Sequence, residues 1–156
     1  MKTNRLLLVA TTLFFTAAAA SFAASPMMGT WKLNEAKSKF SPGATKNHTV
    51  TYTEARGGKT MVTVDGMDKD GKAVHWTWTG KFDGQSYKTK GNPTADSAVY
   101  KPVNDRTNHL TLMKSGKTVA AGTIAVSKDG KSRTVTTTMT DANGKKHTDK
   151  AYYDKE

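Results

Sequence analysis

Residues 74–79 read Val-His-Trp-Thr-Trp-Thr, and this stretch decides the fold. Its large apolar side chains, Val74, Trp76 and Trp78, alternate with smaller or more polar ones. An alternation with a period of two residues is the pattern of a β-strand that buries one face and leaves the other in water. The stretch therefore predicts a strand that points Trp76 and Trp78 toward a core.

Turn signals bound this stretch on both sides and recur at short intervals along the chain. Asp70-Gly71 precedes it and Asp83-Gly84 follows it. Such dipeptides favour tight turns between antiparallel strands, because their residues adopt positive φ at low cost. Further signals are Gly57-Gly58, Gly91-Asn92-Pro93, Asn104-Asp105, Ser115-Gly116, Asp129-Gly130 and Asn143-Gly144. Disordered segments have no reason to space turn residues so evenly, so the chain is expected to fold although it is poor in aliphatic residues.

The segments between these turns alternate in the same way. Val62 and Val64 share one face of their segment, as Leu110 and Leu112 do on another. Within 117–127 the alternation changes phase at Gly122, which predicts a β-bulge there. About ten strands are predicted, near 29–33, 47–55, 59–67, 72–81, 85–89, 96–102, 107–114, 117–127, 131–140 and 146–154.

The connections between these strands determine the predicted topology. They are too short for crossover helices, so consecutive strands must be antiparallel. Only 34–46 differs, because Asn34 can cap a short helical turn over residues 35–39. An open meander of this length would expose two sheet edges, which closure into a barrel removes. We therefore expect an all-β fold, an antiparallel up-and-down meander closed into a barrel.

The N-terminus of the 156-residue chain has the pattern of a signal peptide. Lys2 and Arg5 precede an almost wholly apolar segment, residues 6–15, and the small-x-small sequence at residues 21–23 fits a cleavage site. A membrane anchor, the alternative, requires about 20 apolar residues without so many small polar breaks. We expect a signal peptide at 1–23, a single β-barrel domain at 24–156 and no transmembrane segment in the mature protein.

The cysteine content and the net charge indicate in which compartment the protein acts and which partners it can bind. The chain has no cysteine, and a small exported domain without disulfides is more typical of a bacterial periplasm than of eukaryotic secretion. We expect a periplasmic or secreted protein. With 24 basic and 13 acidic residues, the formal net charge is +11. The cations are mostly scattered lysines, whereas nucleic-acid binding favours clustered arginine with interleaved aromatic residues. The prediction is a solubilising surface with at most weak attraction to anionic surfaces, and no nucleic-acid partner.

The opening strand carries a resemblance to a known superfamily. Residues 29–33, Gly-Thr-Trp-Lys-Leu, resemble the first strand of calycins, in which lipocalins begin with Gly-x-Trp and fatty-acid-binding proteins often with Gly-Thr-Trp-Lys-Leu. Extended to Phe40, the opening is also similar to a group of uncharacterised exported bacterial proteins. The resemblance implies a lipocalin-like barrel. Segment 34–46 is too short for the two-helix lid of fatty-acid-binding proteins.

The same resemblance implies roles for residues late in the chain. In lipocalins a late arginine packs on the first tryptophan, and Arg133 is the candidate for this contact with Trp31. Fatty-acid-binding proteins hold the ligand carboxylate with an Arg-x-Tyr pair on the last strand. Here Lys150 and Tyr152 stand at the matching positions, with the same sign of charge.

Aromatic residues form the candidate ligand site. Trp76 and Trp78 can provide one wall of an apolar pocket, with Tyr52, Tyr87 and Tyr100 across the barrel offering hydroxyl groups to orient a ligand. Lys150 and Tyr152 join this set through the resemblance. The alternative is that the rings only fill the interior. Because a void forfeits packing energy, any pocket is expected to be small or narrow.

Neither metal binding nor catalysis is predicted. The four histidines, at positions 48, 75, 109 and 147, fall on different segments, and their spacing forms no metal site. There is no cysteine nucleophile and no Gly-x-Ser-x-Gly sequence. We expect no cofactor and a monomer that binds a small hydrophobic or amphipathic ligand without chemistry. The alternative is a packed basic barrel whose surface meets an anionic polymer, a membrane surface or a protein partner.

Overall fold

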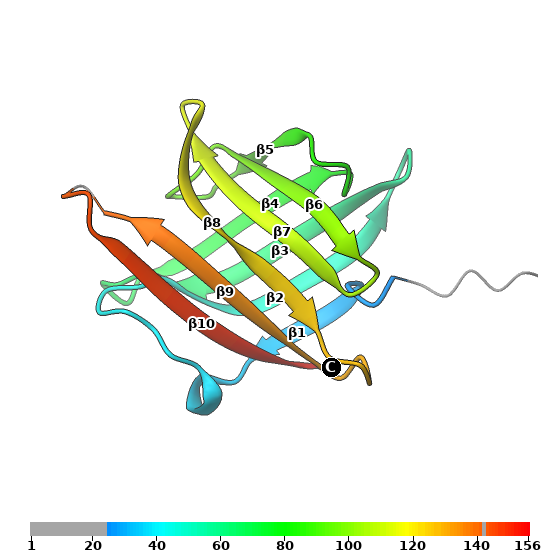
Figure 1. Ribbon diagram of the computed structural model, residues 1–156, viewed down its shortest axis with the longest axis horizontal. Helices are drawn as coiled ribbons and strands as arrows, with labels where there is room; N and C mark the ends of the chain where they lie inside the picture. Colours follow the sequence, from blue (N-terminus) through cyan, green and yellow to red (C-terminus); the bar gives the residue numbers. More distant parts are fainter. Residues whose placement is uncertain (1–24, 142) are drawn as a thin grey trace, which may run out of the picture.

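A computed structural model describes residues 25–141 and 143–156, and the predicted signal peptide, residues 1–23, lies outside them. Ten antiparallel strands follow one another around a closed barrel in chain order, and β1 pairs with β10 to close it (Figure 1). The strands are β1 Gly29–Leu33, β2 Lys46–Ala55, β3 Lys59–Met67, β4 Ala73–Gly80, β5 Ser86–Lys90, β6 Ser97–Asn104, β7 Thr107–Lys114, β8 Lys117–Val126, β9 Ser132–Thr140 and β10 Lys146–Lys155. The predicted up-and-down meander and its closure are confirmed.

The hairpin turns have the predicted chemistry. Between β7 and β8, Ser115 has a φ of 50° and Gly116 a φ of 74°. Two consecutive positive φ values define the turn type whose twist matches that of the flanking strands. The turn at 115–116 therefore reverses the chain, so that β8 runs antiparallel beside β7.

The connection between β1 and β2 contains the only helical turn among the described residues. A 3₁₀-helix, η1, spans Glu35–Lys37, and the Asn34 side chain accepts a hydrogen bond of 3.2 Å from the Lys37 amide. Such a cap satisfies an amide that has no partner within the helix. The predicted cap is confirmed, although the helical turn ends at Lys37 and not at Lys39.

The bulge predicted at Gly122 is wrong in position. Leu112 pairs with Ala120 and Met113 pairs with Thr118, so the extra residue in β8 is Val119. Gly122 has a different role, because a Cβ atom placed on it would overlap the carbonyl oxygen of Thr136 in β9. The glycine permits close approach of the neighbouring strand, a second reason for glycine in a strand.

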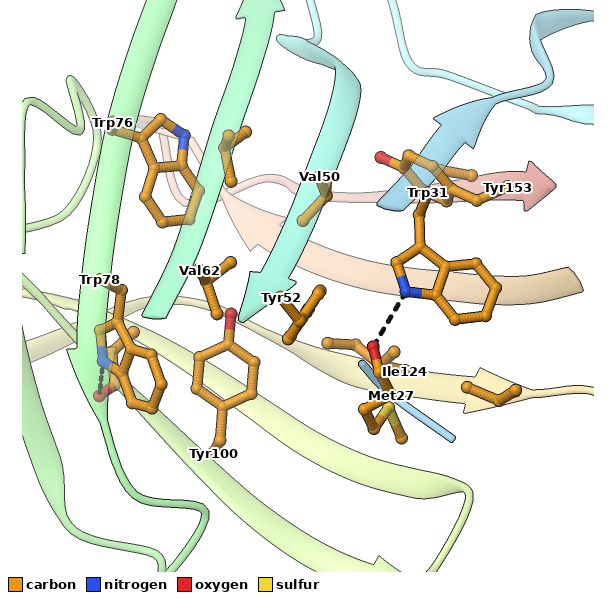
Figure 2. Packing of buried hydrophobic residues seen from close by; sticks show 14 residues of the cluster. Met27, Trp31, Val50, Tyr52, Val62, Trp76, Trp78, Tyr100, Ile124 and Tyr153 are labelled. Carbon is orange, nitrogen blue, oxygen red and sulfur yellow. Dashed lines mark hydrogen bonds between the residues drawn. The ribbon is translucent and has the colours of Figure 1, made fainter. Parts of the chain in front are cut away.

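The barrel interior holds the core. Trp31, Val62, Val64 and Trp78 are almost fully buried, and the alternation predicted around Trp78 places its neighbours outside. Each of the two most deeply buried tryptophans donates its indole N–H to a backbone carbonyl, Trp31 to Met27 at 3.0 Å and Trp78 to Ala98 at 3.2 Å (Figure 2). Buried indole groups thus keep their hydrogen bonds. None of the helical segments in the described residues has the length and apolarity for a bilayer crossing.

Candidate ligand site

A cavity of about 260 Å³ remains inside the barrel. Side chains from both halves of the barrel line it, among them Trp76 on β4, Tyr52 on β2 and Tyr100 on β6, whose rings point into the interior (Figure 2). Its volume lies just below the range of roughly 300–1,000 Å³ that is typical of ligand pockets. The cavity therefore suits a small or narrow molecule, as the sequence predicts.

One end of the cavity is covered by connections between strands. The β1–β2 connection contributes Phe40 and residues 43–45, and the β5–β6 connection contributes residues 92–94. Consecutive strands run in opposite directions, so all odd-numbered strands end at the same end of the barrel. Both connections follow an odd-numbered strand and therefore lie at that end. We call this end of the barrel the mouth.

A buried carboxylate ties the β1–β2 connection to the barrel. Asp149 of β10 is 8% exposed and lines the cavity, and its Oδ1 accepts a hydrogen bond of 2.6 Å from the amide of Ser41. Two backbone hydrogen bonds of 2.8 Å between Lys39 and Lys150 fix the same connection a few residues earlier. The connection is thus held across the mouth by groups on the last strand.

A second hollow of about 380 Å³ adjoins the mouth. It shares Gly43, Ala44, Thr94 and Met139 with the inner cavity and extends outward to Val119 and His147. The two hollows therefore adjoin each other at the β1–β2 and β5–β6 connections.

The opposite part of the interior is filled by aromatic rings. Trp78 stacks on Phe82 with an interplanar angle of 14° and a centroid distance of 6.0 Å, and its centroid lies 4.5 Å from that of Tyr100. Tyr87 packs edge-on against Trp78, and its hydroxyl donates to Asp83 at 2.8 Å. Aromatic pairs in these geometries add to the stability gained by burial.

The predicted aromatic wall is therefore divided between two roles. Trp76, Tyr52 and Tyr100 line the cavity, whereas Trp78 and Tyr87 do not. For Trp78 the filling role holds, because its ring packs against Phe82, Tyr87 and Tyr100. The sequence pattern does not single out Phe82, since it lies in a turn and outside any alternating segment.

The placement of Lys150 and Tyr152 in the interior, implied by the resemblance, is wrong. The inward face of β10 carries Asp149, Ala151 and Tyr153, which line the cavity. In a strand of period two the residues between them must point outward. On the outer face, the Lys150 ammonium lies 5.1 Å from the ring centroid of Tyr152.

Arg133 of β9 is the cation that does face the interior. The side chain is 2% exposed and lines the cavity. Its guanidinium carbon lies 4.8 Å from the ring centroid of Trp31, 5.0 Å from that of Tyr52 and 4.7 Å from that of Tyr153. The contact with Trp31 confirms the packing that the resemblance to lipocalins implies.

The rings around Arg133 do not supply hydrogen-bond acceptors for all of its N–H groups. Its Nε and Nη1 atoms are buried and have no hydrogen-bond partner. Cation–π contacts are worth about 2 kcal/mol each when they are desolvated, whereas a buried charge without an opposite charge costs several kcal/mol. The rings thus offset part of the cost of burying the charge, and two of its donors stay buried without a partner.

Two tyrosines of the cavity, Tyr100 and Tyr153, have raised pKa values. Burial raises the pKa of Tyr153 to about 12, although the charge of Arg133 opposes the rise. Burial also raises the pKa of Tyr100 well above its ordinary value, and the Tyr52 hydroxyl adds to this rise. The Tyr153 hydroxyl donates to the carbonyl of Asn47 at 2.9 Å. Because a phenol has a single donor, the Tyr153 proton is committed to Asn47, and Tyr100 is a second neutral phenol on the lining of the cavity.

The histidines lie away from the cavity's inner wall. His75 contacts Asp65 at 2.6 Å, His147 contacts Asp141 at 2.9 Å, and His109 contacts Thr123 at 3.3 Å. Within residues 25–141 and 143–156, no three histidine, aspartate or glutamate side chains are grouped so that they could hold a metal ion.

Comparison with known proteins gives a structural likeness. No protein-family model matches the chain, and no curated protein matches it. Among solved structures, the chain is similar to a redesigned beta barrel, mFAP1, solved bound to DFHBI. The two are 14% identical, the match covers 84% of this chain and 95% of that one, and the TM-score is 0.43.

Proposed function

We propose that this protein is an exported barrel that binds one small hydrophobic or amphipathic molecule in its inner cavity, without chemistry. The observation that carries the proposal is the cavity of about 260 Å³ that stays open although the interior is crowded with rings. Apolar side chains line much of this cavity, and a bound molecule would remove their surface from water.

The lining supports this class of ligand. Val64, Leu110, Leu112 and Ile124 supply aliphatic surface, and the rings of Trp76 and Tyr100 supply aromatic surface. Burial of apolar area contributes about 25 cal/mol for each Å² removed from water. Polar side chains share this wall with the apolar ones, among them Arg133, Asp149 and Tyr100, and polar groups in a pocket can orient its ligand.

Lysine-rich turns around the mouth support the alternative, action through the surface on an anionic partner. The turns at this end of the barrel carry Lys69, Lys72 and Lys145, and Lys146 follows at the start of β10. Exposed charges interact over about 10 Å at moderate ionic strength and are screened by added salt. Binding at this surface must therefore weaken steeply with salt, whereas apolar binding inside the barrel must not.

A cavity-filling pair of variants tests the proposal. Ala151 lines the cavity, whereas Ala121 is exposed on the outer face of β8. Ala151→Leu places a larger side chain in the cavity, and Ala121→Leu adds the same group outside. Titration calorimetry with decanol and decanoate is expected to show binding by the wild type and by Ala121→Leu, and at least about tenfold weaker binding by Ala151→Leu. Equal affinities in all three proteins, or no binding by the wild type, would exclude the interior site.

The proposed export of the protein is tested separately from ligand binding. This part of the proposal rests on residues 1–23, and cell fractionation with N-terminal sequencing of the mature protein measures it directly. Recovery from the periplasm or medium with a new N-terminus near residue 24 supports export. An intact N-terminus in the cytoplasm contradicts it.

A further inference from the structure

A histidine and an aspartate meet at the edge of the second hollow. His147 of β10 and Asp141, in the β9–β10 turn, both line it, and His147 Nε2 lies 2.9 Å from Asp141 Oδ2. Their side chains are 31% and 34% exposed, so the pair is partly enclosed and still open to small solutes. The ligand proposed for the inner cavity gives this pair no role, since neither residue lines that cavity.

The β9–β10 turn holds the Asp141 carboxylate in place. Its Oδ1 atom accepts hydrogen bonds of 2.9 Å from the amides of Asn143 and Lys145, which leaves Oδ2 to face the imidazole. The hydrogen bond with His147 is the largest cause of a lowered pKa at Asp141. The carboxylate is therefore ionised at neutral pH, and the backbone of the turn fixes its orientation.

A methionine lies opposite the histidine. Met139 of β9 pairs with His147 in the antiparallel ladder, and both residues line the second hollow. Residues directly opposite each other in such a ladder share one face of the sheet, with Cβ atoms about 4.5–5.5 Å apart. An imidazole, a carboxylate and a thioether are thus brought together on one side of the hollow.

We propose that His147, Asp141 and Met139 bind a copper ion at the mouth of the barrel. Imidazole and carboxylate groups bind many divalent metals, and among these copper(II) forms the most stable complexes. A thioether is a ligand that selects copper, whereas zinc sites use cysteine, histidine and carboxylates. Calcium and magnesium require several oxygen ligands, and these three residues offer one carboxylate. The donor set therefore favours copper.

The distance between the nitrogen and oxygen ligands fits a metal ion. Two ligand atoms at right angles on one ion, each about 2.0–2.1 Å from it, lie about 2.9 Å apart. His147 Nε2 and Asp141 Oδ2 have this separation. The ion therefore replaces the proton between the two groups without a large movement of either side chain, and water can complete its coordination from the open side of the hollow.

Two other histidines that contact carboxylates lack this combination. His75 lies 2.6 Å from Asp65, but that aspartate is also its neighbour across the strands, and the histidine is 64% exposed on the outer face of β4. His48 shares Glu35 with the ammonium of Lys46, which lies 2.6 Å from that carboxylate. His75 therefore serves as the matched control, a histidine–aspartate pair without a methionine opposite.

Calorimetric titration with copper(II) and zinc(II) tests the site. The wild type is expected to bind one copper(II) ion with an affinity at least about tenfold above that for zinc(II). His147→Ala is expected to weaken copper(II) binding at least about tenfold, and His75→Ala is expected to leave it unchanged. Equal losses in the two variants, or no copper binding by the wild type, would overturn the site.

Met139→Leu tests the sulfur ligand. Leucine has nearly the same volume, so the variant removes the thioether and keeps the lining of the hollow. In anaerobic titrations against bicinchoninate, copper(I) binding is expected to weaken at least about tenfold, because thioethers favour the reduced ion. Zinc(II) binding is expected to stay within about twofold of the wild type. Equal losses for both metals would mean that Met139 acts by packing, and would overturn the assignment to copper.

Electron paramagnetic resonance of bound copper(II) gives a readout besides affinity. A histidine ligand splits the copper signal through its nitrogen, so the wild-type spectrum is expected to show nitrogen coupling. His147→Gln keeps a polar side chain without the imidazole and is expected to lose this coupling, while far-UV circular dichroism establishes that the barrel is intact. A wild-type spectrum without nitrogen coupling, or a spectrum unchanged in His147→Gln, would show that copper binds elsewhere.

Discussion

The guanidinium carbon of Arg133 on β9 lies 4.8 Å from the ring centroid of Trp31 on β1. The same indole donates to the carbonyl of Met27, and the ammonium of Lys155 on β10 lies 5.0 Å from its ring. Trp31 thus joins the first strand, the last two strands and the segment before β1. The contacts are concentrated at the seam where the barrel closes.

Trp31→Ala is expected to destabilise the barrel strongly. The side chain is fully buried, and removal of a buried tryptophan leaves a cavity and costs about 3–5 kcal/mol. Urea unfolding followed by far-UV circular dichroism measures the loss, and Trp31→Phe, which keeps a ring, is expected to lose less. If Trp31→Ala lowers the free energy of unfolding by less than about 1 kcal/mol, the contacts of Trp31 at the seam are not important for the stability of the barrel.

Asp149→Ala is expected to release the β1–β2 connection from the mouth. Asp149 Oδ1 accepts from the Ser41 amide, and a buried donor left without its acceptor costs about 1–3 kcal/mol. Hydrogen exchange is expected to become faster at the Ser41 amide in this variant. Asp149→Asn keeps an acceptor oxygen and serves as the matched control. Unchanged exchange in Asp149→Ala would mean that other contacts hold the connection.

Stability is expected to fall above pH 10. Burial raises the pKa of Tyr153 from 10.0 in the unfolded chain to about 12 in the folded one. The folded state thus binds the proton more tightly, and this contribution is complete below pH 10 and lost as the pH rises through 12. Between these values each pH unit costs about 1.4 kcal/mol for one such group.

Comparison with Tyr153→Phe isolates this effect. The variant lacks the titrating hydroxyl and its bond to Asn47, so it is expected to be less stable at neutral pH but to lose less between pH 10 and 12. Denaturant unfolding at a series of pH values measures both slopes. Parallel curves for the two proteins would show that Tyr153 does not titrate as described.

Gly122→Ala is expected to be far more destabilising than Gly144→Ala. A Cβ atom at Gly122 overlaps the backbone of β9 at Thr136, whereas the space around Gly144 is open. Gly144 has a φ of 77°. Alanine at this position therefore loses only the free energy needed to hold a residue with a Cβ atom in the left-handed conformation, about 1–2 kcal/mol. Thermal unfolding of both variants gives the comparison. Similar losses would mean that β8 and β9 can separate at Gly122 without cost.

Much of the fold is predictable from local pattern, and the candidate site is predictable only in part. The alternation around Trp76 correctly predicts an inward strand, and Tyr52 and Tyr100 line the cavity together with Trp76. The role of Trp78 is not predictable, because alternation places a ring inside without saying whether another ring stacks on it. The interior placement of Lys150 and Tyr152 fails because a short motif carries no information about which strand face meets the cavity.

The amino-acid sequence by itself determined the elements and their order. Alternation with a period of two and turn residues with positive φ are local properties, so ten antiparallel strands follow from the chain alone. Only the tertiary structure decided which cation is buried, where a void remains and what covers it. Those features depend on closure of the barrel, which brings Trp31 and Tyr52 of the first two strands together with Arg133 and Tyr153 of the last two.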